Sequence, residues 1–394
     1  MKDGEREHSI ALRKRVSATI GDSMHGTKIL TETDRLMTVC NSCRYCEGLC
    51  AVFPAMEMRR AFSDGDLNYL ANLCHGCGAC YTDCQFSPPH EFDVNVPQTL
   101  AIARAESYAA YAWPRAFAGL FARNGLAISL IAAASVAAFI FGFAAANDPA
   151  VLHGVHTGPG AFYALMPHNA MAVLFSAAFL YATLALVMSV RAFWHDIGEP
   201  IGMKTDAKSL FQAIRDAGEL RYLDGGGVGC FNKDENPTDR RKIFHHLTFY
   251  GFALCFAATC VATLYHYLLA REAPYAWWDL PVVLGTLGGI GLLVGPIGLL
   301  VAKSQRDPVL ADQARTGMDV AFIVMLFLTS LTGLLLLLLR ETSLMGPLLA
   351  VHIGVVFALF ITMPYGKFVH GIYRFVALVR YARERQMMAG GAGE

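Results

Sequence analysis

Apolar and polar residues are distributed unevenly along this 394-residue chain. The first hundred residues mix both kinds, whereas six later stretches contain no Asp, Glu, Lys or Arg. Each stretch reaches about 20 residues, the length that an α-helix needs to cross a bilayer. We therefore predict six transmembrane helices, at residues 124–146, 168–190, 245–270, 281–301, 320–339 and 345–366.

The basic residues predict how these helices are oriented. If the N-terminal region is cytoplasmic, then so are segments 191–242, 302–318 and 367–394, which together carry seventeen Lys and Arg residues. The opposite loops carry only Arg271 and Arg340. Because cytoplasmic loops are enriched in Lys and Arg, we expect a multi-pass protein with both termini in the cytoplasm.

The region before the first span is divided into an arm and a domain. Residues 1–35 are charged without a hydrophobic period, and we interpret them as an N-terminal arm; residues 36–121 form a cytoplasmic domain. Its last part, 101–121, is expected to be an amphipathic helix at the membrane surface. Four aromatic residues of this part suit such an interface: Tyr108, Tyr111, Trp113 and Phe117.

Eight of the eleven cysteines form two runs of identical spacing. The runs are Cys40-x2-Cys43-x2-Cys46-x3-Cys50 and Cys74-x2-Cys77-x2-Cys80-x3-Cys84. In bacterial two-cluster ferredoxins, the first three cysteines of such a run bind one cluster and the fourth binds the other. We predict two [4Fe–4S] clusters, with cluster one on Cys40, Cys43, Cys46 and Cys84, and cluster two on Cys74, Cys77, Cys80 and Cys50.

Other uses of these cysteines fit the pattern less well. Structural zinc is usually bound by two separated pairs of cysteines, and disulfides require an oxidising compartment, for which no signal peptide is evident. One departure from the ferredoxin pattern is that Ala51 and Gln85 replace the proline that usually follows the fourth cysteine. Between the runs, 55–62 and 66–73 are expected to be short helices, the second capped by Asp64. This favours an α-helical ferredoxin-like domain.

Composition excludes some function classes. The formal net charge is zero, so there is no basic surface for nucleic acid. Hydrophobic residues make up 55% of the chain and charged residues 16%, as expected when about half of a protein lies in the membrane. No glycine fingerprint for a dinucleotide and no nucleophile elbow is present, so no chemistry on an organic substrate is expected in this chain.

Histidines in and near the spans are candidate haem ligands, because an ionisable residue at membrane depth is a functional candidate. The alternative for each is a ring in the headgroup region. His352 and His370 are eighteen residues apart, or five helical turns, and share a face; His245 and His266 nearly do so. Two levels result: His245 or His246 with His370 on the cytoplasmic side, and His266 with His352, or with His168 as a rival, on the outer side.

Paired imidazoles from two helices can hold a b-type haem within a bundle. The expected fold is therefore an α-helical membrane protein in which the ferredoxin-like domain precedes a six-helix bundle like that of b-type cytochromes, carrying one or two haems. The bundle covers residues 122–372, with a cytoplasmic loop at 195–244 and a tail at 373–394. The loop contains a predicted helix near 207–220 and three glycines, 225–227, which are either a flexible turn or a contact with the cluster domain.

Several stretches resemble the tricarballylate/citrate utilisation protein B family. Besides the cysteine runs, they include LRYL at 220–223, RRKIFHH at 240–246, ATLYHY at 262–267, LGTLGG at 284–289 and MPYGKFVH at 363–370. The resemblance implies a protein of the bacterial inner membrane that takes electrons from a cytoplasmic FAD-dependent tricarballylate/citrate-type dehydrogenase. It further implies transfer through the clusters and haem to membrane quinone, so that the chain is the electron-transfer subunit of an oxidoreductase.

Two other classes of function remain open. The first is a transporter with an iron–sulfur regulatory domain, which would show helix-breaking interruptions in corresponding spans. Gly295-Pro296 is the one strong interruption, and no repeat matches it. The second is a redox sensor that binds a signalling partner and has no need of haem.

Overall fold

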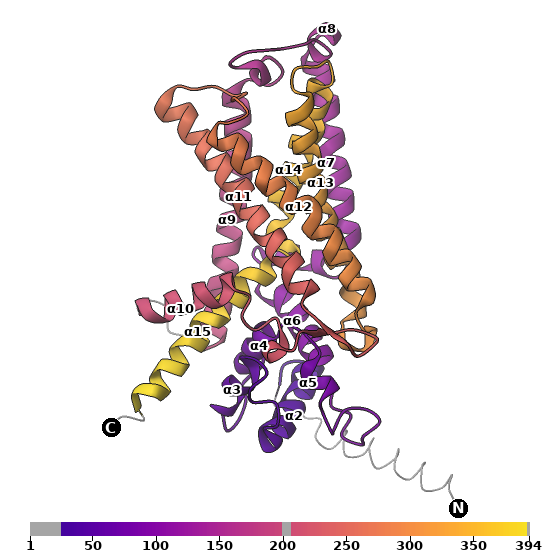
Figure 1. Cartoon of the computed structure of the whole chain (residues 1–394), viewed down its shortest axis with the longest axis vertical. Coiled ribbons are helices and arrows are strands. Elements are labelled where there is room, and N and C mark those ends of the chain that lie inside the picture. Colours follow the sequence, from indigo (N-terminus) through magenta and orange to yellow (C-terminus); the bar gives the residue numbers. More distant parts are fainter. Residues whose placement is uncertain (1–24, 199–205, 392–394) are drawn as a thin grey trace, which may run out of the picture.

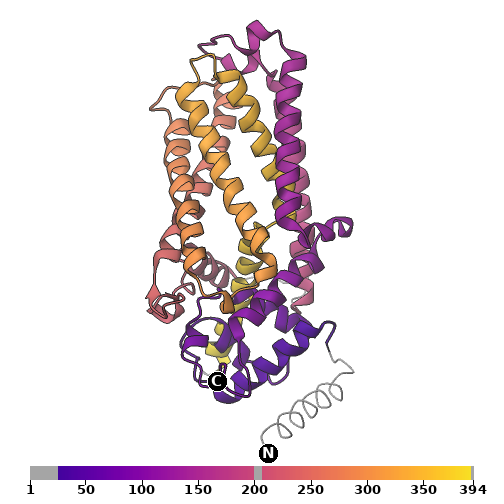
Figure 2. The same ribbon diagram turned by 90° about the vertical axis from the view of Figure 1, so that its right-hand side faces the viewer.

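The computed structural model describes residues 25–198 and 206–391, so residues 1–24 of the predicted arm lie outside the described part. A small helical domain caps one end of a long helical bundle (Figures 1 and 2). We call the end of the bundle next to this domain the cluster end. The opposite end, near α8 (Pro149–Leu152), is the far end. In the described residues the only strands are β1 (Cys230–Phe231) and β2 (Pro237–Thr238), which pair antiparallel.

The domain at the cluster end consists of short helices around the two cysteine runs. They are α2 (Lys28–Cys43), α3 (Val52–Glu57), α4 (Asp64–Leu73), α5 (Ala79–Thr82) and α6 (Val96–Tyr111). The cap of α4 is Ser63 rather than the predicted Asp64: the Asp66 amide donates to the Ser63 hydroxyl, and the Ser63 amide donates to the Asp66 carboxylate. This reciprocal capping box fixes where the helix starts, just before the second cysteine run.

The predicted interfacial helix over 101–121 is wrong in two respects. Helix α6 ends at Tyr111, and a 3-10 helix η1 (Arg115–Phe121) follows, because Pro114 interrupts the helical pattern. Tyr108 and Tyr111 are buried, with ring centroids 5.7 and 5.9 Å from that of Tyr373. These two aromatics therefore belong to a protein core.

Among the described residues, six helices are long and apolar enough to cross a membrane, as the sequence predicts. They are α7 (Asn124–Ala146), α9 (His168–Asp196), α11 (Arg240–Leu269), α12 (Leu280–Gln305), α13 (Thr316–Leu339) and α14 (Met345–Thr362). The connections contain α8 (Pro149–Leu152), η2 (Ala161–Ala164), α10 (Ala207–Gly218), η3 (Gly225–Gly227), η4 (Pro308–Leu310), η5 (Gln313–Arg315) and η6 (Met363–Tyr365).

Glycines let α11 and α12 pack with their backbones in contact. A Cβ atom added to Gly288 would lie 2.7 Å from the carbonyl oxygen of Gly251, and one added to Gly251 would lie 2.9 Å from that of Gly288. Small residues at such positions allow membrane helices to approach closely. This contact fixes α11, which carries three of the candidate histidines and is the least buried of the six spans.

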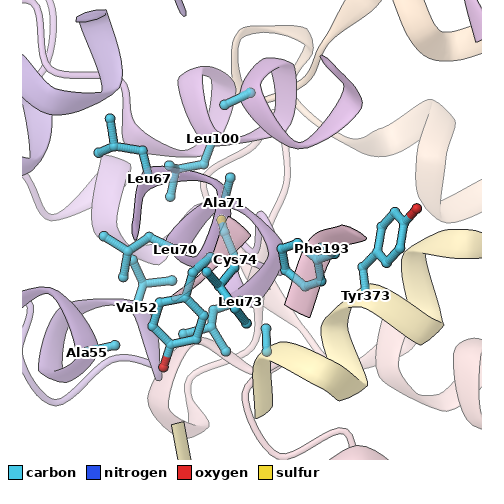
Figure 3. Packing of buried hydrophobic residues seen from close by; sticks show 14 of the residues in the cluster. Val52, Ala55, Leu67, Leu70, Ala71, Leu73, Cys74, Leu100, Phe193 and Tyr373 are labelled. Atoms are coloured by element: carbon cyan, nitrogen blue, oxygen red, sulfur yellow. The ribbon is translucent and has the colours of Figure 1, made fainter. Parts of the chain in front are cut away.

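Residues 373–391 of the segment expected to be a tail belong to helix α15 (Val369–Gly391), and the last three residues lie outside the described part. The helix packs against the cluster domain and α9, as Figure 3 shows for Tyr373 and Phe193 beside the core residues of α4. Glu384 of α15 accepts hydrogen bonds from Tyr69 and Arg59, and Arg380 pairs with Asp66. The last helix thus connects the cluster domain to the membrane bundle.

Candidate metal centres

The first cavity in the cluster domain is lined by cysteines from both runs. Helix α2 brings Cys40 and Cys43 to its C-terminal end, where Arg44 adopts a left-handed conformation with φ 57° and turns the chain back. Cys84 reaches the same cavity from the end of the second run. The lining cysteines are Cys40, Cys43, Cys46, Cys80 and Cys84, a set that includes the four predicted for cluster one.

The second cavity has a lining that includes the four residues predicted for cluster two. Its cysteines are Cys50, Cys74, Cys77 and Cys80. Gly76 and Gly78, with φ values of 60° and 93°, supply the left-handed turns that fold the run around the cavity. The structure therefore brings the fourth cysteine of each run to the cavity of the other run.

The chemistry of these two linings fits iron–sulfur clusters. All eleven cysteines are free thiols, and no three metal-binding side chains among the described residues converge on one point as a single ion requires. Each set instead surrounds a cavity, as the ligands of a multi-atom cluster must. Burial raises the pKa of the Cys40 thiol to about 12 and that of Cys77 to about 11, so cluster binding must displace protons there.

The glycine run of the loop between α9 and α11 contacts the cluster domain. A Cβ atom on Gly225 would lie 3.5 Å from the sulfur of Cys77, and one on Gly226 would lie 3.2 Å from the Cα atom of Leu49. The Phe231 amide donates to the carbonyl of Cys77 at 2.8 Å. Of the two interpretations of these glycines, the structure therefore favours a contact with the cluster domain.

His75 is a functional candidate that the sequence analysis missed. It is buried between Cys74 and Gly76, lines the second cavity, and its Nδ1 atom has no hydrogen-bond partner. Burial and the cations of Arg374 and Arg241 hold the pKa of His75 well below its usual value, and His245 contributes to the same shift. His75 therefore lines the second cavity, and its backbone carbonyl accepts a hydrogen bond from Arg241 of α11. Its position inside the second cysteine run was the available signal.

At the cluster end of the bundle, His245 of α11 faces His370 of α15. The prediction that His352 and His370 share a face of one helix is wrong, because η6 (Met363–Tyr365) interrupts the chain between α14 and α15. Their ring centroids are 6.0 Å apart and the rings are inclined by 72°. The Nδ1 atom of His370 contacts the backbone carbonyl of Lys367, an arrangement that orients metal-binding imidazoles and leaves Nε2 available. The Nδ1 atom of His245 is buried without a partner. Burial and the charge of Lys367 hold the pKa of His370 well below its usual value, which favours the neutral form that a metal-binding imidazole needs.

At the far end, the structure pairs His266 with His168. Their rings stack with centroids 3.7 Å apart and planes inclined by 18°. His352, the other predicted partner of His266, instead hydrogen-bonds through Nδ1 to Thr332 of α13 at 3.0 Å. Face-to-face stacking leaves no space for a macrocycle between these two rings, so the far pair does not fit a haem in this arrangement.

Of the predicted ligands, His246 lies apart from both histidine pairs, and Tyr365 near His370 has its own hydrogen bonds. The ring of His246 lies beside Tyr250, with centroids 5.9 Å apart, and its Nε2 atom is buried without a partner. The hydroxyl of Tyr365 is bound to Tyr181 at 2.7 Å and to the carbonyl of Trp113 at 3.0 Å. These contacts orient Tyr365 toward α9 and the segment before η1.

Comparisons with known proteins identify the family. The family description "Citrate utilization protein B" matches residues 119–391, and its "Fer4-like domain" matches residues 33–110. The chain belongs to the citrate utilization protein B family. It is 49% identical over 374 residues to the "Citrate utilization protein B" of Escherichia coli, which covers 93% of this chain and 97% of that protein. No solved structure matches the chain.

The family match confirms the resemblance that the sequence motifs indicate. Both cysteine runs fall within the Fer4-like domain, and all six spans fall within the second matched region. The Fer4-like match supports iron–sulfur binding by the cluster domain. Membership of the citrate utilization protein B family thus agrees with a helical membrane protein that carries a ferredoxin-like domain.

Proposed function

We propose that this chain is a membrane electron-transfer subunit for the utilisation of citrate or tricarballylate. It would take electrons from a cytoplasmic FAD-dependent dehydrogenase and deliver them to membrane quinone, with its cluster end and both termini in the cytoplasm of a bacterium. The observation that supports this proposal is the set of groups gathered at the cluster end: two cysteine-lined cavities that share Cys80, His75 in the lining of the second, and the His245–His370 pair.

The protein residues have separate roles in this proposal. Cys40, Cys43, Cys46 and Cys84 hold cluster one, and Cys74, Cys77, Cys80 and Cys50 hold cluster two. When bound, the clusters supply one-electron carriers, and a b-type haem adds a carrier within the membrane.

His245 and His370 would hold that haem, because one ring has an unpaired buried nitrogen and the other is oriented by a backbone carbonyl. The α11–α12 backbone contact at Gly251 and Gly288 fixes the helix that carries His245. We include one haem, since the stacked rings of His168 and His266 do not fit a second.

The experiment is to purify the protein without oxygen, measure non-haem iron, and record optical spectra before and after reduction. About eight non-haem irons per chain are expected from two clusters, together with a b-type Soret band that shifts on reduction. Protein with both clusters and no haem band would favour the redox sensor. Protein without clusters would remove the proposal, and transport of a tricarboxylate without quinone reduction would favour the transporter.

A further inference from the structure

Four arginines from four different elements surround the loop at the start of the second cysteine run. Arg104 of α6 and Arg374 of α15 both donate to the carbonyl of Cys74, the latter at 2.7 Å. Arg241 of α11 donates to the carbonyls of residues 75 and 76 at 2.9 and 3.1 Å. Arg306, which follows α12, donates to the carbonyl of residue 76 at 3.0 Å. Residues distant in the sequence therefore place their charge beside one short loop.

In the part of the chain that the structure describes, no carboxylate forms an ion pair with any of these four half-buried arginines. Asp319, the carboxylate that contributes to the environment of Arg306, already bridges Lys303 at 2.7 Å and Lys367 at 2.8 Å. Burial and the neighbouring guanidinium groups lower the pKa of Arg306 and of Arg374 to about 10. This part of the protein is therefore electropositive, and desolvated cations are costly unless an anion balances them.

Gly76 allows this loop to approach Arg306 closely. A Cβ atom at Gly76 would lie 2.9 Å from the Nη2 atom of Arg306, and the φ of 60° at Gly76 favours glycine as well. Arg104 and Arg374 both donate to the backbone carbonyl of Cys74. Their guanidinium groups therefore lie against the backbone of a predicted ligand of cluster two.

The loop of the first run has a different environment. Arg44, Tyr45, Glu47 and Gly48 are exposed between its cysteines, whereas His75, Gly76, Gly78 and Ala79 are buried between those of the second run. Solvent therefore screens charges near the first run, and it screens charges near the buried part of the second run much less. The same ligand spacing therefore occurs in two different electrostatic settings.

We infer that the four arginines raise the reduction potential of cluster two above that of cluster one, which makes cluster two the electron acceptor within the pair. This inference rests on the proposed function. A cluster with four thiolates gains one negative charge when it is reduced, and nearby cations stabilise that charge. One electron moves from cluster one to cluster two, no bond forms or breaks, and the flavoprotein supplies the electron. The exposed cluster is then the entry point and the buried cluster faces the membrane.

The experiment is a redox titration of the anaerobically purified protein, followed by the EPR signals of the reduced clusters. A Cys77→Ser variant identifies the signal of cluster two by its loss. In Arg306→Gln, the reduction equilibrium of cluster two is expected to become at least tenfold less favourable, a shift of 59 mV for one electron. Arg241→Gln should shift the same signal in the same direction.

Two controls separate charge from structure. Arg306→Lys keeps the charge and loses the planar fork, so it should keep a potential near that of the wild type. Arg44→Gln removes an exposed charge beside the first run and should move neither potential by a comparable amount.

Equal shifts in Arg306→Lys and Arg306→Gln would show a structural role and overturn the inference, as would an unchanged cluster-two potential. Wild-type protein without cluster signals would instead remove the proposed function.

Discussion

The two cysteine runs have the same spacing and different surroundings. The first lies at the end of α2 with exposed residues between its cysteines, and the second is enclosed by α6, α11, α15 and the loop after α12. Ligand spacing decides which atoms bind a cluster, whereas burial and nearby charge set its potential and accessibility. Two copies of one motif can therefore take different positions in an electron-transfer chain.

The largest effect that tests this comparison is the loss of one cluster at a time. Cys84→Ser is expected to remove the cluster of the first run, although Cys84 belongs to the second run. Cys50→Ser is expected to remove the cluster of the second run, although Cys50 belongs to the first. Each should lower non-haem iron by about half. Iron analysis with EPR of the reduced protein measures this, and Cys260→Ser, an exposed cysteine of α11, serves as the control. Loss of the signal from the variant's own run would refute the crossed ligation.

The next-largest effect is on the haem spectrum that we assign to the His245–His370 pair. His370→Ala removes one imidazole of the 6.0 Å pair and should abolish the reduced-minus-oxidised haem spectrum while the cluster signals remain. His352→Ala is the matched control, because that ring hydrogen-bonds to Thr332 rather than to a second histidine. If His352→Ala lost the spectrum and His370→Ala kept it, the haem would be at the other end of the membrane.

A smaller effect should appear in accessibility. We expect an iron chelator added to the protein to remove the cluster of the first run several times faster than that of the second, because the first is bordered by exposed residues. EPR samples frozen at intervals would give the two rates. Equal rates would mean that the enclosure of the second run does not protect its cluster.

The smallest effect is on the stability of the contact between α11 and α12, the helices that lead to Arg241 and Arg306 beside the second run. Gly288→Ala places a methyl group 2.7 Å from the carbonyl oxygen of Gly251 and should destabilise the α11–α12 contact by roughly 1–3 kcal/mol. Thermal unfolding in detergent, followed by circular dichroism, measures this. Gly142→Ala on α7 is the control, since no atom lies within 4 Å of the added Cβ. An unchanged midpoint for Gly288→Ala would show that α11 and α12 accommodate the methyl group without loss of stability.

The sequence by itself determined the features that depend on neighbouring residues. Six apolar stretches define six spans because helix length and bilayer thickness are fixed quantities. The cysteine spacing defines the two sets of thiols because a short run must fold around its own cavity. The ferredoxin pattern also predicts the crossing of Cys50 and Cys84, but the contact between the two runs that it requires belongs to the tertiary structure.

Only the tertiary structure decided which distant residues meet. Periodicity places His266 and His352 on helical faces, but the rotation and packing of the helices pair His266 with His168 and turn His352 toward Thr332. The charge around the second run is equally inaccessible to sequence reasoning, because its arginines come from four separated elements. Such contacts arise from the packing of whole helices, and no spacing along the chain encodes them.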